Sequence, residues 1–118
     1  MRWKYEQSTG NMYKDGKLIE TGYSGALTNK NNPDRQQVKG LGPLPRGTYS
    51  IAGHSVSKGP VTIILEQTSG ESFGRSEFRI HGEHKHGPAG YASEGCIILS
   101  LQTRRMILRD GGDLEVVR

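Results

Sequence analysis

The chain has 118 residues, a mass of 13.0 kDa and a formal net charge of +4, which suits a single domain over residues 1–118 and excludes two separate cores. Its hydrophobic content of 32% is low, but Tyr, Ile, Leu and Val recur in short clusters between 17 glycines, as in a folded β-rich chain. No stretch approaches the roughly 20 apolar residues that span a bilayer, and the N-terminus lacks the apolar run of a signal peptide, so we expect a protein made in the cytoplasm without membrane insertion.

The first half of the chain predicts a β-meander followed by a long loop. Residues 3–7 alternate between apolar and polar side chains. The turn Lys14-Asp15-Gly16 between residues 11–13 and 17–19 is the strongest hairpin signal in the sequence. Residues 25–46 carry many Asn, Gly and Pro residues, which sustain neither a helix nor a central strand. We expect an ordered loop there, and such long loops are often functional.

The middle of the chain predicts three further strands, at residues 47–52, 61–66 and 77–80. The turn Lys58-Gly59-Pro60 joins the first two of these strands, and His81 directly follows the third. Residues 82–92 are polar and contain Gly and Pro, which indicates a loop.

The last quarter predicts one short helix and a closing strand. Ser100 follows the apolar run 97–99 and is a suitable N-cap for a helix over residues 101–109, which the glycines after it would end. Residues 114–117 have the composition of a strand. We therefore predict a mostly β domain with one short helix.

Cys96 is the only cysteine, so it cannot form an internal disulfide. A thiol becomes a nucleophile only as thiolate, and it needs a nearby base or positive charge to form one. Three histidines, His81, His84 and His86, stand shortly upstream. His81 is the best candidate base because a strand end fixes a side chain better than a loop does. His84 and His86 are expected to be solvated loop residues, and the sequence assigns no role to His54.

The residue before the cysteine, Gly95, has no Cβ and would let a substrate carbonyl approach the backbone closely. The amides of Gly95 and Cys96 are therefore candidate donors to the oxyanion of a tetrahedral intermediate. The alternative is that Cys96 is a buried small hydrophobic residue beside the apolar run 97–99, which is a common fate of a free cysteine. The residues alone leave these two interpretations about equally supported.

Several motifs accompany the candidate pair of Cys96 and His81. They are Gly42-Pro43-Leu44-Pro45-Arg46-Gly47-Thr48-Tyr49, Phe78-Arg79-Ile80-His81-Gly82 and Ala92-Ser93-Glu94-Gly95-Cys96-Ile97, together with Gly22-Tyr23-Ser24-Gly25, Asn31-Asn32-Pro33 and Gly74-Arg75-Ser76. The first three resemble the signature of L,D-transpeptidases of the YkuD type. The last three, together with Ser93-Glu94-Gly95-Cys96, resemble the Tlde1 family, compact L,D-transpeptidase-like toxins delivered by type VI secretion. Matches extend from Tyr5 to Val117.

Three features depart from the broad superfamily. Glu94 stands where most YkuD-type enzymes have a second histidine, and Ile98 stands where an Arg or Asn commonly follows the cysteine. The loop between His81 and Ser93 is also short. These departures are shared by the narrower toxin family, so they indicate the subfamily.

The resemblance implies a YkuD-like β-sandwich or barrel-like sheet and a cofactor-free cysteine enzyme. It implies that Cys96, with His81 as base and general acid, removes the terminal D-alanine of peptidoglycan tetrapeptide stems through a thioester. Water would then give L,D-carboxypeptidase activity, and a D-amino acid would give L,D-transpeptidase exchange. The carbonyl of Gly82 would orient the imidazole.

Four further residues receive expected roles. Ser93 would shape the loop or hydrogen-bond near His81, and Glu94 would contact substrate. Arg75 would pair with a substrate carboxylate, although an ion pair with Glu71 or Glu77 explains it equally well. Tyr23 would line the cleft, although a tyrosine at a strand end is more often simply packed.

The resemblance also implies an antibacterial effector that acts in the periplasm of target bacteria and is blocked by a cognate immunity protein. A prophage or housekeeping wall enzyme has the same chemistry and stays an alternative. A metal site is a weaker alternative. Residues of types that bind metals are present, but their spacing does not match a recognised zinc site; they are His81, Glu83, His84, His86 and Cys96. A non-catalytic wall-binding module or a basic nucleic-acid binder is the remaining alternative, although no dense Lys/Arg run supports the latter.

Overall fold

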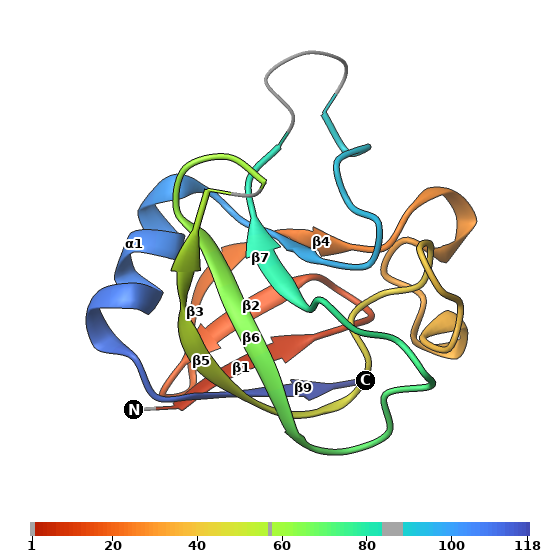
Figure 1. The fold of residues 1–118 in the computed structure, drawn as a ribbon, viewed down its shortest axis with the longest axis horizontal. Helices are drawn as coiled ribbons and strands as arrows, with labels where there is room; N and C mark the ends of the chain where they lie inside the picture. The colour runs from red at the N-terminus through yellow and green to blue at the C-terminus, as the bar shows by residue number, and fades with distance from the viewer. Residues whose placement is uncertain (1, 57, 84–88) are drawn as a thin grey trace.

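The computed structural model describes residues 2–56, 58–83 and 89–118, which form one sheet with a single α-helix against it (Figure 1). Within these residues the strands are β1 (Arg2–Glu6), β2 (Asn11–Lys14), β3 (Lys17–Thr21), β4 (Tyr23–Ser24), β5 (Gly47–Ser55), β6 (Thr62–Ser69), β7 (Arg79–His81), β8 (Ile97–Ile98) and β9 (Asp113–Val117). The helix α1 spans Leu101–Asp110, and two 3-10 turns, η1 (Leu27–Asn29) and η2 (Pro33–Arg35), lie in the loop after β4. No helix in the described ranges is both long and apolar enough to cross a membrane.

The sheet curls back on itself. Its strand order is β3-β2-β1-β9-β5-β6-β7-β8-β4, so the two edge strands, β3 and β4, are separated in sequence only by Gly22. A Cβ on Gly22 would lie 2.0 Å from the carbonyl oxygen of Ile98, so only glycine allows this close approach. The result is a barrel-like sheet, and the predicted mostly β class is confirmed.

Most strand pairs are antiparallel, but β1 pairs with β9 and β7 pairs with β8 in parallel. In the second of these pairs, Ile80 is opposite Ile97 and His81 is opposite Ile98. Parallel neighbours need a crossover between them. Here the connection from β7 to β8 carries the loop that begins at Gly82 and ends at Cys96.

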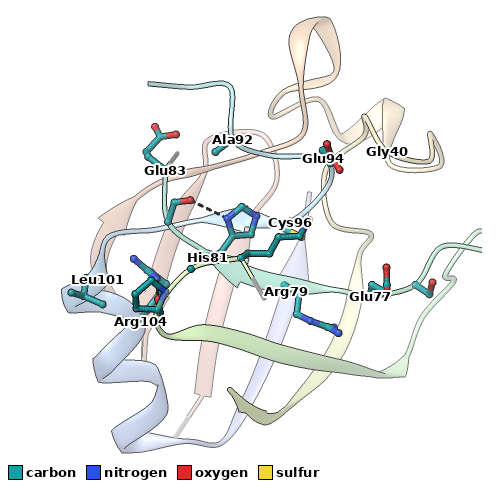
Figure 2. A pocket seen from close by; sticks show the side chains of 15 residues that line it. Gly40, Glu77, Arg79, His81, Glu83, Ala92, Glu94, Cys96, Leu101 and Arg104 are labelled. Atoms are coloured by element: carbon teal, nitrogen blue, oxygen red, sulfur yellow. Dashed lines mark hydrogen bonds between the residues drawn. The ribbon is translucent and has the colours of Figure 1, made fainter. Parts of the chain in front are cut away.

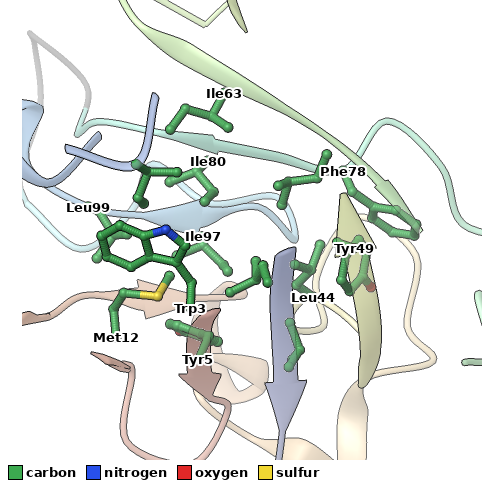
Figure 3. Close-up of a cluster of buried hydrophobic side chains, with 14 residues drawn as sticks. Trp3, Tyr5, Met12, Leu44, Tyr49, Ile63, Phe78, Ile80, Ile97 and Leu99 are labelled. Carbon is green, nitrogen blue, oxygen red and sulfur yellow. The ribbon is translucent and has the colours of Figure 1, made fainter. Parts of the chain in front are cut away.

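The hydrophobic core fills the inside of the curled sheet (Figure 3). Alternate residues of β1, Trp3 and Tyr5, are fully buried, as the alternation in the sequence predicts. Ile80 and Ile97 are also buried there. Since successive side chains of a strand point to opposite faces, these two isoleucines direct their sequence neighbours to the outer face.

The predicted hairpin, helix and closing strand are confirmed. Asp15 and Gly16 adopt positive φ between β2 and β3, as a tight hairpin turn requires. Ser100 is the N-cap of α1, with its Oγ accepting a hydrogen bond from the Thr103 amide at 3.4 Å. The helix extends one residue beyond the predicted end.

Two predicted strand starts were wrong. The strand expected from residue 61 starts at Thr62, and the strand expected from residue 77 starts at Arg79. Val61 and Glu77 have φ of 56° and 57°, which is the left-handed region and cannot continue a strand. The second shift places His81 within β7 as its last residue rather than just beyond it.

The expected loop over residues 25–46 is ordered by buried amides. The Gln7 side chain donates to the side-chain oxygen of Gln36 at 3.1 Å and to the carbonyl of Leu44 at 2.9 Å. The same Gln36 oxygen accepts from the amide of Arg46 at 2.9 Å. Such satisfied buried polar groups fix a loop in one conformation.

Candidate active site

His81 is the last residue of β7, and Cys96 directly precedes the neighbouring strand β8. Because Ile80 and Ile97 are paired and point into the core, the residues next to them, His81 and Cys96, point outward together. Both line one cavity of about 1090 Å³, and Figure 2 shows the imidazole beside Cys96. The arrangement on which the predicted chemistry depends is therefore present.

Gly82 holds the imidazole of His81. His81 is 4% exposed, and its Nδ1 is 2.9 Å from the carbonyl oxygen of Gly82 (Figure 2). A carbonyl oxygen only accepts, so Nδ1 carries the proton and Nε2 is the nitrogen that can take a proton from a thiol. The contact expected from the resemblance is thus found in the structure.

Burial raises the pKa of the Cys96 thiol. A hydrogen bond from the backbone of Arg79 and the positive charges of Lys58, Arg79 and Arg75 act in the opposite direction but do not cancel the effect of burial. The thiol is half-buried and protonated at neutral pH. A base must therefore remove its proton as it attacks.

Ser93 sets the shape of the turn before the cysteine. Its buried hydroxyl accepts hydrogen bonds from the amides of Gly25 at 2.9 Å and Gly95 at 3.1 Å, and it donates to the carbonyl of Cys96 at 2.6 Å. This is the shaping role expected from the sequence. It corrects the expectation for Gly95, whose amide points at Ser93 and not toward a substrate oxyanion. The amide of Cys96 is the candidate donor that is left.

Arg75 binds the protein's own backbone, which the sequence did not predict. Its guanidinium donates to the carbonyls of three residues of the loop before β5, Gln36, Gly42 and Pro43, at 3.0 Å for Gly42 and 2.7 Å for Pro43. The ion pair considered with Glu71 or Glu77 is also absent from the salt bridges of the described residues. Arg75 therefore fixes a loop against the cysteine turn.

Gly95 contacts this guanidinium. It has a φ of +114°, and a Cβ built on it would lie 2.2 Å from Nη2 of Arg75. Both the backbone angle and the space therefore require glycine at this position. The turn that presents Cys96 is consequently held between Ser93 on one side and Arg75 on the other.

Tyr23 connects the ends of the loop after His81 and is not among the residues lining the cavity, which corrects the expectation. Its hydroxyl donates to Glu83 and accepts from the amide of Ala92 at 3.0 Å, while the other oxygen of Glu83 accepts from Gly90 at 2.9 Å. Burial and the bond to Glu83 raise the pKa of Tyr23 to about 12. Glu94, the other residue predicted to contact substrate, is exposed and lines the cavity.

The cavity also contains cations that the sequence did not single out. Lys58, Arg79 and Arg104 line it together with His81 and Cys96. Arg104 is 8% exposed although it carries a charge. A sequence signal existed for it, since Arg104 lies one helical turn before Ile107 on the apolar face of the predicted helix.

The metal alternative involves residues that the structure does not cover. His84 and His86 lie outside the described residues. Within the described ranges, no group of three His, Cys, Asp or Glu side chains is close enough together to hold a metal ion.

Residues 19–117 match the family model of the Tlde1 domain. The chain belongs to the Tlde1 domain family. The crystal structure of a cysteine-to-serine mutant of Enterococcus faecium L,D-transpeptidase resembles it with a TM-score of 0.57 and 15% identity, over 98% of this chain and 49% of that one. The Tlde1 chain thus spans about half the length of that protein and shares its fold, which confirms the expected L,D-transpeptidase fold. No curated protein sequence matches significantly.

Replacement of Gly95 by alanine tests the tight turn in this Tlde1 domain. The new Cβ would collide with a guanidinium fixed by carbonyls, so the sulfur must move, and we expect activity on the proposed substrate to fall about 100-fold. Gly16→Ala is the matched control, because Gly16 also has positive φ, 86°, but nothing lies within 4 Å of its Cβ position. Equal losses in both variants would show that backbone strain alone, and not the contact with Arg75, matters.

The raised thiol pKa can be measured by alkylation. We expect the rate of iodoacetamide reaction at Cys96 to rise with pH at a higher midpoint than in a peptide of residues 93–98, because burial opposes the thiolate. By linkage, the folded protein should also lose stability above about pH 8.5, where the unfolded chain gives up its thiol proton first. A midpoint below that of the peptide would contradict the protonated resting state.

Proposed function

We propose that this Tlde1-domain protein is a cysteine-dependent enzyme of the L,D-transpeptidase type that acts on peptidoglycan tetrapeptide stems. The observation that carries the proposal is that His81, the last residue of β7, and Cys96, directly before β8, line one cavity, with Nδ1 of the imidazole engaged by Gly82. Membership of the Tlde1 family and the L,D-transpeptidase fold support it.

The first step forms a thioester. Nε2 of His81 takes the thiol proton while the Cys96 sulfur attacks the carbonyl that joins diaminopimelate to the terminal D-alanine. The amide of Cys96 is the proposed donor to the oxygen that becomes negatively charged. The imidazolium then gives its proton to the amine of D-alanine, the carbon–nitrogen bond breaks, and free D-alanine leaves.

The second step resolves the thioester. Neutral His81 takes a proton from the incoming nucleophile, which attacks the thioester carbonyl, and it returns that proton to the departing Cys96 thiolate. Water as the nucleophile gives a shortened stem, which is carboxypeptidase activity. The amine of another D-amino acid gives an exchanged stem. One acyl-enzyme therefore serves both reactions, and no cofactor takes part in either.

Mass spectrometry of tetrapeptide muropeptides tests this chemistry. Intact protein is expected to release D-alanine, or to exchange it when another D-amino acid is added. Cys96→Ala should abolish turnover, and His81→Ala should lower it about 10²–10⁴-fold because the base is lost. His54→Ala is the matched control, because His54 is an exposed histidine on β5 that does not line the cavity. Stems that keep their D-alanine with intact protein would refute the proposed function.

We further propose the antibacterial role that the Tlde1 family suggests, in which the enzyme is delivered to the periplasm of target bacteria and its producer is protected by an immunity protein. Expression in a test bacterium should then be toxic when the chain is directed to the periplasm and tolerated in the cytoplasm, where no stems are cross-linked into wall. Cys96→Ala should remove the toxicity. Growth that is unaffected by periplasmic intact protein at matched protein levels would contradict the toxin role and favour a housekeeping wall enzyme.

A further inference from the structure

Arg104 has a guanidinium that the protein fixes from two sides. Its Nε donates to the carbonyls of Leu99 at 3.1 Å and Ser100 at 3.3 Å, just before α1. Its Nη1 donates to the carbonyls of Pro60 at 2.7 Å and Val61 at 3.1 Å, just before β6. The plane and the position of the group are therefore set in advance, so little side-chain entropy is lost when it binds a ligand.

The third nitrogen of Arg104 faces the cavity. Nη2 has no hydrogen bond to any residue that the structure describes, and a Cβ built on Gly82 would lie 2.5 Å from it. Nη2 is not a buried atom either. Within the described ranges, the one buried side-chain nitrogen or oxygen without a hydrogen-bond partner is Tyr5 Oη. Two N–H donors thus reach the cavity next to the residue that orients His81.

The acidic residues of the cavity do not occupy these donors. Glu83 is engaged through both oxygens, by the Tyr23 hydroxyl and by the Gly90 amide. Glu77 and Glu94 lie on the opposite side of His81 from Arg104 (Figure 2). Glu20, whose charge acts on Arg104, accepts hydrogen bonds from Ser100 through both of its oxygens. Nη2 of Arg104 is therefore a fixed cationic group with two N–H donors left, and such a group makes charge-assisted hydrogen bonds to a carboxylate.

We propose that Nη2 of Arg104 binds a carboxylate of the substrate and so selects stems that carry it. The inference rests on the proposed function, because each of the two residues that flank the bond to be broken carries a free carboxylate. One belongs to the terminal D-alanine, and the other to the side chain of diaminopimelate. The chemistry at Arg104 is the same for both, so the experiment must distinguish them.

Three synthetic stems make that distinction: one with both carboxylates free, one with the terminal D-alanine as its amide, and one with the diaminopimelate side chain as its amide. For intact protein, we expect kcat/KM to fall roughly 10- to 100-fold for the one amide that removes the bound charge, and to change little for the other. Equal kcat/KM on all three stems would overturn the proposal while leaving the proposed function in place.

The variant Arg104→Met should reduce kcat/KM on the free stem by a similar factor and should cause little further loss on the sensitive amide. A merely structural Arg104 would instead give the same loss on all three stems, which would overturn the proposal. Arg105→Met is the matched control, since Arg105 is the next residue of α1 and is exposed. Thermal unfolding shows whether each variant folds.

If Arg104→Met does not fold, calorimetry can still test the proposal. It measures how tightly the inactive Cys96→Ala protein binds each of the three stems. Tighter binding of the free stem than of one amide supports the carboxylate site even if no stem is turned over, which would refute only the proposed chemistry. Equal binding of all three stems overturns the site. If no stem is bound or turned over, the site and the proposed function both fail.

Discussion

The parallel pairing of β7 with β8 is the constraint on which the rest of the site depends. It places Ile80 opposite Ile97 in the core, and it thereby brings His81 and Cys96 to the same outer face. Residues 15 positions apart in sequence can meet in this way because a crossover returns the chain in the same direction. A one-residue slip in this register would send the imidazole into the core, so packing and catalysis depend on the same isoleucine pair.

Two arginines stabilise the backbone on the two sides of this pair. Arg75 lies next to Gly95 and donates hydrogen bonds to carbonyls of the loop before β5. Arg104 lies next to Gly82 and donates to carbonyls just before α1 and β6. Burial lowers the pKa of both guanidinium groups, but arginine stays charged at any physiological pH. Each glycine is needed because its neighbouring guanidinium leaves no space for a Cβ. The two differ in the nitrogens that are engaged, since both Nη atoms of Arg75 donate to carbonyls, whereas Nη2 of Arg104 keeps its donors beside Gly82 in the cavity of His81 and Cys96.

The sequence predicted elements whose signals are local, and it missed those that depend on distant contacts. The turn at Asp15 and Gly16 and the N-cap Ser100 were predictable because each is decided within a few residues. The carbonyl partners of Arg75 lie more than 30 positions away, so neither composition nor spacing could reveal them. The role of Gly95 was misjudged although its partner, the Ser93 hydroxyl, is only two residues away, because that hydroxyl also accepts from the amide of Gly25, 68 positions earlier in the chain.

The protonated thiol gives His81 a defined task. In a site where charges are well hydrated, a thiolate could exist before substrate arrives, but here desolvation favours the neutral thiol. A neutral thiol is a poor nucleophile, so proton transfer and attack must occur together, and the imidazole must be aimed before the reaction begins. The carbonyl of Gly82 orients the imidazole through a contact of 2.9 Å, and Nη2 of Arg104 lies close to the same glycine. A carboxylate bound at Arg104 would therefore be held close to Gly82, whose carbonyl orients the imidazole of His81. Recognition of the substrate would in this way be coupled to the geometry of proton transfer.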